Sequence, residues 1–292
     1  MSELRYSYYP GCSLHASASE YDLSTREVFA ALGVGLTEVP DWICCGATPA
    51  HNVDELLSLS LCAKNLELAE QVPGDMVVAC AACFSRLKFA QHVLKENEHK
   101  LHQVEQAIDA KVPVNQNVKH LLEILVRDLG AERLAQAVKK PLSGLKVACY
   151  YGCLLTRPPE VPQLDDCEAP TIMERLLHAI GAETVDWTHK MECCGANFTL
   201  SRPGVVLQLS NAILDSAKAA GADCIMVGCP LCHGNLDIRQ KEIEGVYHRS
   251  YDMPIFYLTQ LVGLALKVPA ERLGLDALIV SPQKLLRERK LL

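Results

Sequence analysis

The sequence lacks long apolar runs, clusters of basic residues and an apolar leader. None of its 292 residues belongs to a run approaching the roughly 18 apolar residues of a membrane span, and the N-terminal stretch MSELRYSYYP has no apolar core. We therefore expect a cytoplasmic protein without a membrane span of its own. The net charge of -7 and the pI of about 5.8 argue against a nucleic-acid partner, because binding to phosphates needs clustered Lys and Arg.

Cysteine, in contrast, is abundant. The chain has 14 cysteines. Because the cytosol keeps thiols reduced, this number does not indicate a disulfide framework, and it points instead to metal binding or redox chemistry.

The two halves of the chain repeat one another. The segments YSYYPGCSL, DWICCGA and GDMVVACAAC recur in the same order as VACYYGCLL, MECCGA and ADCIMVGCPLC. The repeat predicts two domains, residues 1–141 and 142–292. Ten cysteines pair across it: Cys12 with Cys153, Cys44 with Cys193, Cys45 with Cys194, Cys80 with Cys229, and Cys83 with Cys232. Four have no counterpart, and we expect them to be small packing residues: Cys62, Cys149, Cys167 and Cys224.

Apolar stretches alternate with amphipathic ones in each half. Strands are predicted over residues 5–9, 36–39 and 76–79 in the first half, and over 146–151, 183–187 and 224–228 in the second. This alternation predicts an α/β fold of two duplicated, Rossmann-like βαβ halves with parallel sheets, related by a pseudo-twofold axis. Every repeated cysteine follows a strand. Because ligands gather at the carboxyl ends of parallel strands, we expect the cysteines of one half to converge.

Each half carries the spacing C-x(n)-CC-x34-C-x2-C, with n of 31 in the first half and 39 in the second. Structural zinc and an ordinary cubane [4Fe-4S] cluster each take four ligands, so a set of five leaves one thiol over. Adjacent cysteines leave the backbone in diverging directions and most naturally reach different metal atoms. The spacing favours a spread-out iron-sulfur cluster, while zinc sites and dithiol redox chemistry remain alternatives.

The doubled pattern resembles the CCG domain family, and the whole chain is similar to the B subunit of heterodisulfide reductase. The resemblance rests on YYPGCSL, DWICCGA, ACAACF, CYYGCLL, ECCGA and VGCPLCHGNLDIRQ. It implies two noncubane [4Fe-4S] clusters, each held by five cysteines, between which a disulfide is cleaved. The implied ligands of the first cluster are Cys12, Cys44, Cys45, Cys80 and Cys83; those of the second are Cys153, Cys193, Cys194, Cys229 and Cys232.

The resemblance also implies partners. The chain contains no ferredoxin-type C-x2-C-x2-C-x3-C run and no glycine-rich flavin fingerprint. We therefore expect electrons from the ferredoxin-type [4Fe-4S] subunit and the flavin subunit of a heterodisulfide reductase complex, HdrC-like and HdrA-like respectively. We expect a small-molecule disulfide such as the coenzyme M–coenzyme B heterodisulfide as substrate. The alternative is an electron-transfer CCG subunit of another complex, acting in lactate or glycolate oxidation, thiol-driven fumarate reduction, succinate oxidation or sulfur oxidation.

Histidines and arginines near the cysteines are candidates for proton delivery or anion binding, although hydrogen-bonded or solvated side chains are the simpler interpretation. They are His15, His51 and His233, and Arg86, Arg157 and Arg202.

Overall fold

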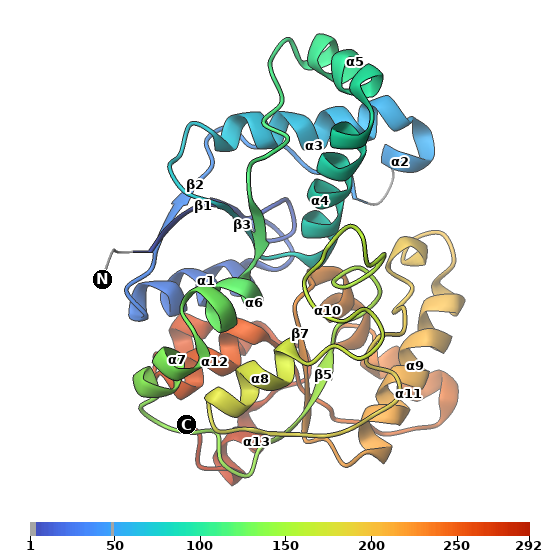
Figure 1. Cartoon of the computed structure of the whole chain (residues 1–292). Coiled ribbons are helices and arrows are strands. Elements are labelled where there is room, and N and C mark those ends of the chain that lie inside the picture. Colours follow the sequence, from blue (N-terminus) through green and yellow to red (C-terminus); the bar gives the residue numbers. More distant parts are fainter. Residues whose placement is uncertain (1–3, 48–49) are drawn as a thin grey trace.

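The computed structural model describes residues 4–47 and 50–292. Residues 1–3 of the first predicted domain, and Thr48 and Pro49 after the first cysteine pair, lie outside the described residues. The chain forms two four-stranded parallel sheets with helices packed around them (Figure 1). The predicted α/β fold with two similar halves is confirmed.

The first sheet has the order β2-β1-β3-β4. Its strands are β1 (Arg5–Tyr9), β2 (Gly35–Glu38), β3 (Met76–Val78) and β4 (Val118–His120). The helices of this half are α1 (Ser19–Ala31), α2 (Ala50–Val53), α3 (Glu55–Ala69), α4 (Ala81–Glu96), α5 (Glu98–Ile108), α6 (Leu121–Glu123), the π-helix η1 (Ile124–Asp128) and α7 (Ala131–Ala137).

The second sheet repeats this topology as β6-β5-β7-β8. Its strands are β5 (Lys146–Tyr150), β6 (Glu183–Thr184), β7 (Cys224–Val227) and β8 (Ile255–Tyr257). The helices are α8 (Ile172–Ala179), α9 (Pro203–Ala219), α10 (Pro230–Leu236), α11 (Gln240–Tyr247), α12 (Leu258–Ala265) and α13 (Gln283–Glu288), with short 3-10 turns η2 (Ala196–Phe198), η3 (Ala270–Leu273) and η4 (Leu275–Ala277).

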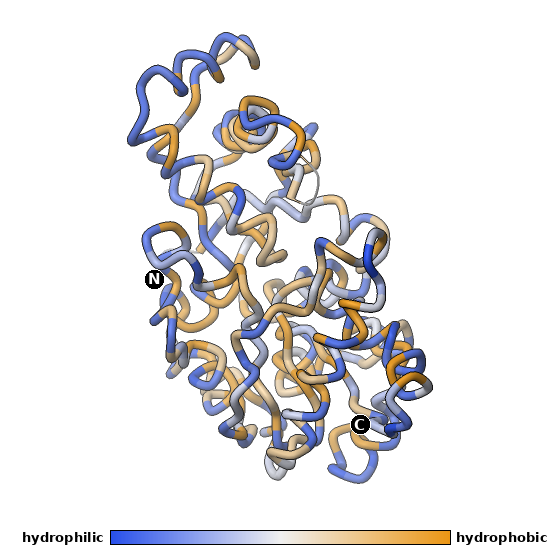
Figure 2. The backbone as a smooth tube through the Cα atoms, turned by 90° about the vertical axis from the view of Figure 1, so that its right-hand side faces the viewer, coloured by the Kyte–Doolittle hydropathy of each residue, from blue (hydrophilic) through white to orange (hydrophobic). Residues whose placement is uncertain are grey.

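All six strands expected from the sequence are present, and each sheet has one more. The additional strands, β4 and β8, come after the second helix that follows each C-x-x-C, α5 and α11 respectively. The central strands β3 and β7 are buried on both faces, which suits parallel strands covered by helices on either side. Figure 2 shows the complementary pattern at the periphery, where the outermost helix α5 is largely hydrophilic.

Helix α1 of the first half packs against α12 of the second half. Within this contact the hydroxyl groups of Ser24 and Thr259 are hydrogen-bonded at 2.7 Å. The rings of Tyr21 and Tyr257 stack with their centroids 4.1 Å apart. The contact is buried, so the two halves form one continuous core.

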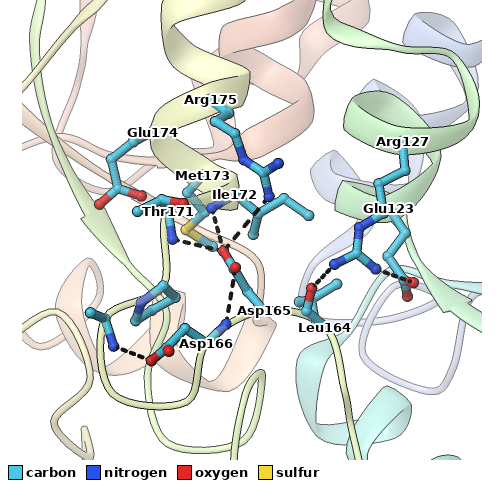
Figure 3. Close-up of polar contacts among 12 residues, drawn as sticks. Glu123, Arg127, Leu164, Asp165, Asp166, Thr171, Ile172, Met173, Glu174 and Arg175 are labelled. Carbon is cyan, nitrogen blue, oxygen red and sulfur yellow. Dashed lines mark hydrogen bonds and ion pairs between the residues drawn. The ribbon is translucent and has the colours of Figure 1, made fainter.

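The second half carries a longer connection between its first two cysteine segments, and this connection also contacts the first half. The Asp165 carboxylate accepts hydrogen bonds from the backbone N–H groups of Thr171 and Ile172, at 2.7 and 2.6 Å, and so caps the start of α8. Arg127 of η1 donates to the Leu164 carbonyl (Figure 3). The longer spacing of 39 residues in the second half, against 31 in the first, therefore includes a structured bridge between the halves.

Candidate metal centres

The five repeated cysteines of the first half converge at the carboxyl edge of its sheet. Cys12 follows β1, the pair Cys44 and Cys45 follows β2, and Cys80 is the N-cap residue of α4, directly after β3. Because β2, β1 and β3 are parallel neighbours, their ends lie side by side. The Sγ atoms of Cys12 and Cys44 are 3.7 Å apart, and those of Cys45 and Cys83 are 3.2 Å apart.

The second half reproduces this arrangement. The Sγ atoms of Cys153 and Cys193 are 3.7 Å apart, and those of Cys194 and Cys232 are 3.6 Å apart. In both halves, therefore, the two adjacent cysteines contact different partners: the first contacts the cysteine after the first strand, and the second contacts the last cysteine of the C-x-x-C. In the first half Cys44 and Cys45 also contact each other, so the divergence of adjacent thiols expected from the sequence is partial there.

Burial divides each set into a rim and a floor. Cys12, Cys44 and Cys193 are exposed, and Cys153 is half-buried. The other six are buried: Cys45, Cys80, Cys83, Cys194, Cys229 and Cys232. Each set therefore has a rim of two sulfurs that reagents can reach and a floor of three that solvent does not reach.

The rim pairs are poised to carry negative charge. Contact with Cys12 lowers the pKa of Cys44 to about 2, and contact with Cys153 lowers the pKa of Cys193 to about 6. The backbone N–H groups two residues further on donate to these same sulfurs, at 3.4 and 3.3 Å. The pKa values of Cys12 and Cys153 are raised in return, because each pair shares one proton. A thiolate is the form in which cysteine binds metals, so each rim is prepared for metal binding.

The two floors meet between the halves. The thiols of Cys80 and Cys229 lie against each other. This contact raises the pKa of Cys80, and the contacts of Cys229 with Cys232 and with Cys80 lower the pKa of Cys229. The backbone N–H of Ala81 donates to the carbonyl of Gly228 at 3.1 Å, joining the two C-x-x-C segments directly. The two sets of cysteines therefore touch each other through their floors.

The donor set fits a multi-metal cluster better than a single ion. Two ligands of one tetrahedral metal with bonds of about 2.3 Å lie about 3.8 Å apart, close to the spacing of three of the sulfur pairs. Among residues 4–47 and 50–292, however, no group of three or more Cys, His, Asp or Glu side chains is placed so that it could hold a single metal ion. Sulfurs held in separate pairs match an extended cluster, in which each metal takes one or two cysteines, whereas a structural zinc site would gather four ligands.

A cavity of about 170 Å³ adds a second observation. Its lining includes all five cysteines of the second set. In both halves, a glycine before the first cysteine lets the backbone pass close to the last cysteine of the set, because it has no Cβ. A Cβ on Gly11, where φ is +74°, would lie 3.1 Å from the Cys83 Sγ; a Cβ on Gly152, where φ is +64°, would lie 3.3 Å from the Cys232 Sγ. The second set thus borders an open space that the first half also lines, through Ala81, Ala82 and Arg86.

The CCG family of cysteine-rich domains matches this chain twice, over residues 6–88 and 147–237. Each match spans one complete set of five cysteines. The chain belongs to the CCG family.

Relatives of this CCG chain match it over almost its whole length. The 8-methylmenaquinol:fumarate reductase membrane anchor subunit of Wolinella succinogenes is 33% identical over 281 residues, which are 96% of this chain and 98% of that protein. The B subunit of the ferredoxin:CoB-CoM heterodisulfide reductase of Methanosarcina mazei is 30% identical over 93% of this chain and 92% of that protein. A protein of Archaeoglobus profundus, named as similar to the heterodisulfide reductase B subunit, is 27% identical over 96% of each chain.

A solved structure of a hypothetical protein from Helicobacter pylori has the same fold. It superposes with a TM-score of 0.77 at 14% sequence identity, over 96% of this chain. The superposed region is 53% of that protein, so this chain spans about half of its length. In the part of the CCG chain that the structure describes, no helix is both long enough and apolar enough to cross a membrane.

Two tyrosines that sequence reasoning did not assign hold the adjacent cysteines in place. The hydroxyl of Tyr9 donates to the carbonyl of Ile43 at 2.8 Å, and the hydroxyl of Tyr150 donates to the carbonyl of Glu192 at 2.7 Å. Each carbonyl belongs to the residue just before the cysteine pair. The signal was in the sequence, because Tyr9 and Tyr150 occupy equivalent places in the repeated YYPGC and CYYGC segments.

The second site has an additional donor. Asn235 donates through Nδ2 to the Cys194 carbonyl at 3.1 Å and contacts the Cys194 Sγ at 3.6 Å. The equivalent position in the first half is Arg86, which lines the cavity of the second set instead. Nothing in the sequence pattern indicated that Arg86 of one half borders the cysteines of the other.

The unpaired cysteines and nearby histidines have separate surroundings. Cys62, Cys149 and Cys224 are buried and Cys167 is half-buried. The Cys62 thiol donates to the carbonyl of Cys45 at 3.5 Å, so it supports the first site from beneath.

His15 contacts Glu38 at 3.2 Å and has its ring against Trp42. His233 is buried, with its Nε2 3.0 Å from the carbonyl of Ile255. His51 has a buried Nδ1 with no partner among the described residues. Of the other two arginines, Arg157 is hydrogen-bonded to the carbonyl of Cys167 at 3.1 Å, and Arg202 is the N-cap residue of α9.

Proposed function

We propose that this chain is the catalytic iron-sulfur subunit of a heterodisulfide reductase-type complex, which reduces a disulfide to two thiols at two noncubane [4Fe-4S] clusters. The observation that carries the proposal is the presence of two complete sets of five cysteines whose floors meet at Cys80 and Cys229. Relatives named as B subunits of heterodisulfide reductases, which match almost end to end, support it.

The proposed ligands are the two sets defined above, Cys12, Cys44, Cys45, Cys80 and Cys83 in one half and Cys153, Cys193, Cys194, Cys229 and Cys232 in the other. When bound, each cluster would supply one electron and an iron able to accept sulfur. Cleavage of a disulfide takes up two electrons and two protons and yields two thiols, so two sites that each supply one electron match the reaction. The buried floors keep water away from the inner sulfurs, while the rims leave one side of each site accessible.

The cavity of the second set suggests where part of the substrate lies. Its wall is mainly apolar, formed by alanines, Leu154, Phe198 and Leu231 in addition to the cysteines. Among the described residues that line it, Arg86 is the one formally charged side chain. A guanidinium in an apolar wall binds carboxylate, sulfonate or phosphate well, so we place an anionic end of the disulfide or thiol beside Arg86.

The proposal includes the rest of the assembly. Electrons would arrive from an HdrC-like, ferredoxin-type [4Fe-4S] subunit, supplied in turn by an HdrA-like flavin subunit. The names of the relatives describe them as subunits of reductases. We place the two domains at residues 1–141 and 142–292 and the protein in the cytoplasm.

A second candidate is an electron-transfer subunit of another redox complex. The observation that favours it is the 33% identity to a protein named as a subunit of 8-methylmenaquinol:fumarate reductase. In that case both cysteine sets would still hold clusters, but no disulfide would be cleaved.

Anaerobic reconstitution of the full chain tests the proposal first. We expect about eight irons and about eight acid-labile sulfides per chain, since each set would hold four of each. Two zincs with little iron would contradict it. Four irons with one zinc would rule out a mechanism that needs two clusters.

A second measurement separates the two candidates. With a chemically reduced dye as electron donor, the iron-loaded chain should cleave a small disulfide to two thiols, and added thiol should change the spectra of its clusters. Loaded clusters that neither turn over disulfides nor respond to thiols would favour the electron-transfer role.

A further inference from the structure

The two cysteine sets touch at a junction built from the residues that precede each C-x-x-C. Ala79 precedes Cys80, and Gly228 precedes Cys229. A backbone hydrogen bond joins these two segments, from the Ala81 N–H to the Gly228 carbonyl, at 3.1 Å. The two segments follow strands of different sheets, so no strand pairing holds them together. Side-chain contacts must therefore supplement this backbone hydrogen bond.

His120 occupies this junction. It ends β4, is completely buried, and places its Nε2 2.9 Å from the carbonyl of Ala79. Its Nδ1 accepts a hydrogen bond from the N–H of Leu122 at 3.3 Å. A carbonyl only accepts, so the Nε2 carries the proton and the ring is neutral. Burial agrees with this assignment, since it lowers the pKa of His120 to about 4.

The same ring also lies against the second half. A Cβ on Gly228 would be 3.1 Å from the Cε1 of His120, so the absence of a side chain at Gly228 is what allows the close approach. The Gly228 backbone contributes to the hydrogen-bonding surroundings of His120. One histidine therefore touches the residue before Cys80 and the residue before Cys229.

Tyr21 of α1 reinforces this junction. Its hydroxyl donates to the same Ala79 carbonyl at 3.0 Å. Its ring stacks on Tyr257 of the second half. The Ala79 carbonyl thus receives two buried donors, from β4 and from α1, and one of these donors is itself packed against the other half.

The duplicated half uses its own buried histidine differently. Phe84 and His120 form a ring pair in the first half, and His233 and Tyr257 form the corresponding pair in the second. His233, however, is paired with the carbonyl of Ile255, which belongs to its own half. Of these two histidines, His120 is thus the one that joins the halves.

We propose that His120 is a positioning residue that holds the Cys80 and Cys229 segments in contact and so sets the electronic coupling between the two metal centres. This inference rests on the proposed function, because it assumes that both cysteine sets bind clusters. Electronic overlap decays steeply with separation, so the distance between the two floors controls how readily one electron at each centre can be combined in a two-electron reaction.

The test compares His120→Leu, His120→Gln and Tyr21→Phe with the unaltered chain. Gln91→Leu is the matched control. Gln91 is also buried, but it donates to the carbonyls of Val114 and Gln116, which lead into β4, and so its hydrogen bonds go to neither C-x-x-C segment. Iron per chain and the magnetic interaction between the two reduced centres are measured by elemental analysis and electron paramagnetic resonance.

We expect His120→Leu to retain both clusters but to weaken the magnetic interaction by at least about threefold, because a displacement of ~1 Å is enough to disrupt a positioned pair. His120→Gln should restore most of it, since its amide can donate to the Ala79 carbonyl. Gln91→Leu should lose stability with the interaction unchanged. Full iron with an unchanged interaction in His120→Leu would overturn the proposal. If that variant does not fold, Tyr21→Phe takes its place, with a smaller decrease expected and no decrease overturning the proposal.

A second arm needs no metal, and it separates failure of this inference from failure of the proposed function. In metal-free protein, diamide oxidises thiols of the exposed rim to a disulfide and takes up the two electrons and two protons. Thiol–disulfide exchange between neighbouring sulfurs then carries the bond to the buried floors. The fraction of chains linked between Cys80 and Cys229, measured by peptide mass spectrometry, should fall at least about threefold in His120→Leu and stay unchanged in Gln91→Leu. An unchanged fraction in His120→Leu would overturn the positioning role, whether or not the chain binds iron.

Discussion

Replacing Gly11 with alanine should empty the first metal centre and leave the second one filled. Gly11 has a φ of +74°, and a Cβ there would lie 3.1 Å from the Cys83 Sγ and 3.3 Å from the Cε1 of Tyr9. Two costs follow. Holding alanine in the left-handed region costs about 1–2 kcal/mol. The new methyl group also displaces either Cys83, a proposed ligand, or Tyr9, which holds the residue before Cys44.

Gly33 provides the matched control. It lies in the same half, its φ is +67°, and a Cβ there would meet nothing within 4 Å. Gly33→Ala therefore carries the conformational cost without the displacement. At about 2–4 °C per kcal/mol for a chain of this size, Gly33→Ala should melt about 2–8 °C below the unaltered protein, and Gly11→Ala, which bears the displacement as well, should melt lower still. Only Gly11→Ala should also lose metal.

The assay is iron and acid-labile sulfide per chain after anaerobic reconstitution, together with the melting temperature. We expect about eight irons in Gly33→Ala and about four in Gly11→Ala, the remaining four belonging to the second set. In the second half, Gly152→Ala should have the mirror-image effect, with Gly221→Ala as its control, because a Cβ at Gly221 also meets nothing within 4 Å. If Gly11→Ala binds as much iron as Gly33→Ala, the close approach of backbone to sulfur has no part in building the centre.

Three further predictions concern ligands, substrate and pH. Cys45→Ser should lose iron from the first centre. Cys62→Ala should keep its iron and lower the free energy of unfolding by about 1 kcal/mol. Equal iron loss in both variants would show that the repeat does not separate ligands from packing cysteines. Arg86→Met should weaken the spectral response to the anionic thiol 3-mercaptopropionate about tenfold and leave the response to neutral 2-mercaptoethanol unchanged. Equal weakening for both thiols would contradict an anion-binding role for Arg86. Burial lowers the pKa of His120 and His233 to about 4 from 6.5, so between pH 6.5 and 4 the unfolded chain binds protons that the folded chain excludes. The free energy of unfolding should therefore fall as the pH drops through this range, by up to about 3 kcal/mol per histidine, and urea titrations of His120→Gln should show a smaller fall than the unaltered protein.

Local patterns in the sequence were sufficient for the fold. Of the eight strands in the structure, the sequence predicted six. The inner strands β1, β3, β5 and β7 were the clearest, because a parallel strand covered on both faces is apolar along most of its length. Strands β4 and β8 were not assigned, because β4 contains the polar residues Lys119 and His120 and β8 continues without a break into the apolar helix α12, so neither is a bounded apolar run. The predicted strand at 183–187 is shorter in the structure, where β6 covers Glu183–Thr184.

The sequence by itself also determined which cysteines gather. The duplication separates the ten repeated cysteines from the other four. The parallel topology brings the ends of neighbouring strands to one edge of each sheet, and with them the cysteines that follow these strands. The assignment of these ten as cluster ligands stays a prediction.

Only the tertiary structure decided how the two halves meet. The contact of Cys80 with Cys229, the position of His120 beneath it and the reach of Arg86 into the second cavity all depend on how α1 packs against α12. That packing joins residues more than two hundred positions apart, such as Ser24 and Thr259. Periodicity and spacing record the neighbours of a residue along its own helix or strand. The packing of one buried surface against another depends on the shapes of many side chains that are far apart along the sequence. It therefore produces no periodic pattern that the sequence alone would show.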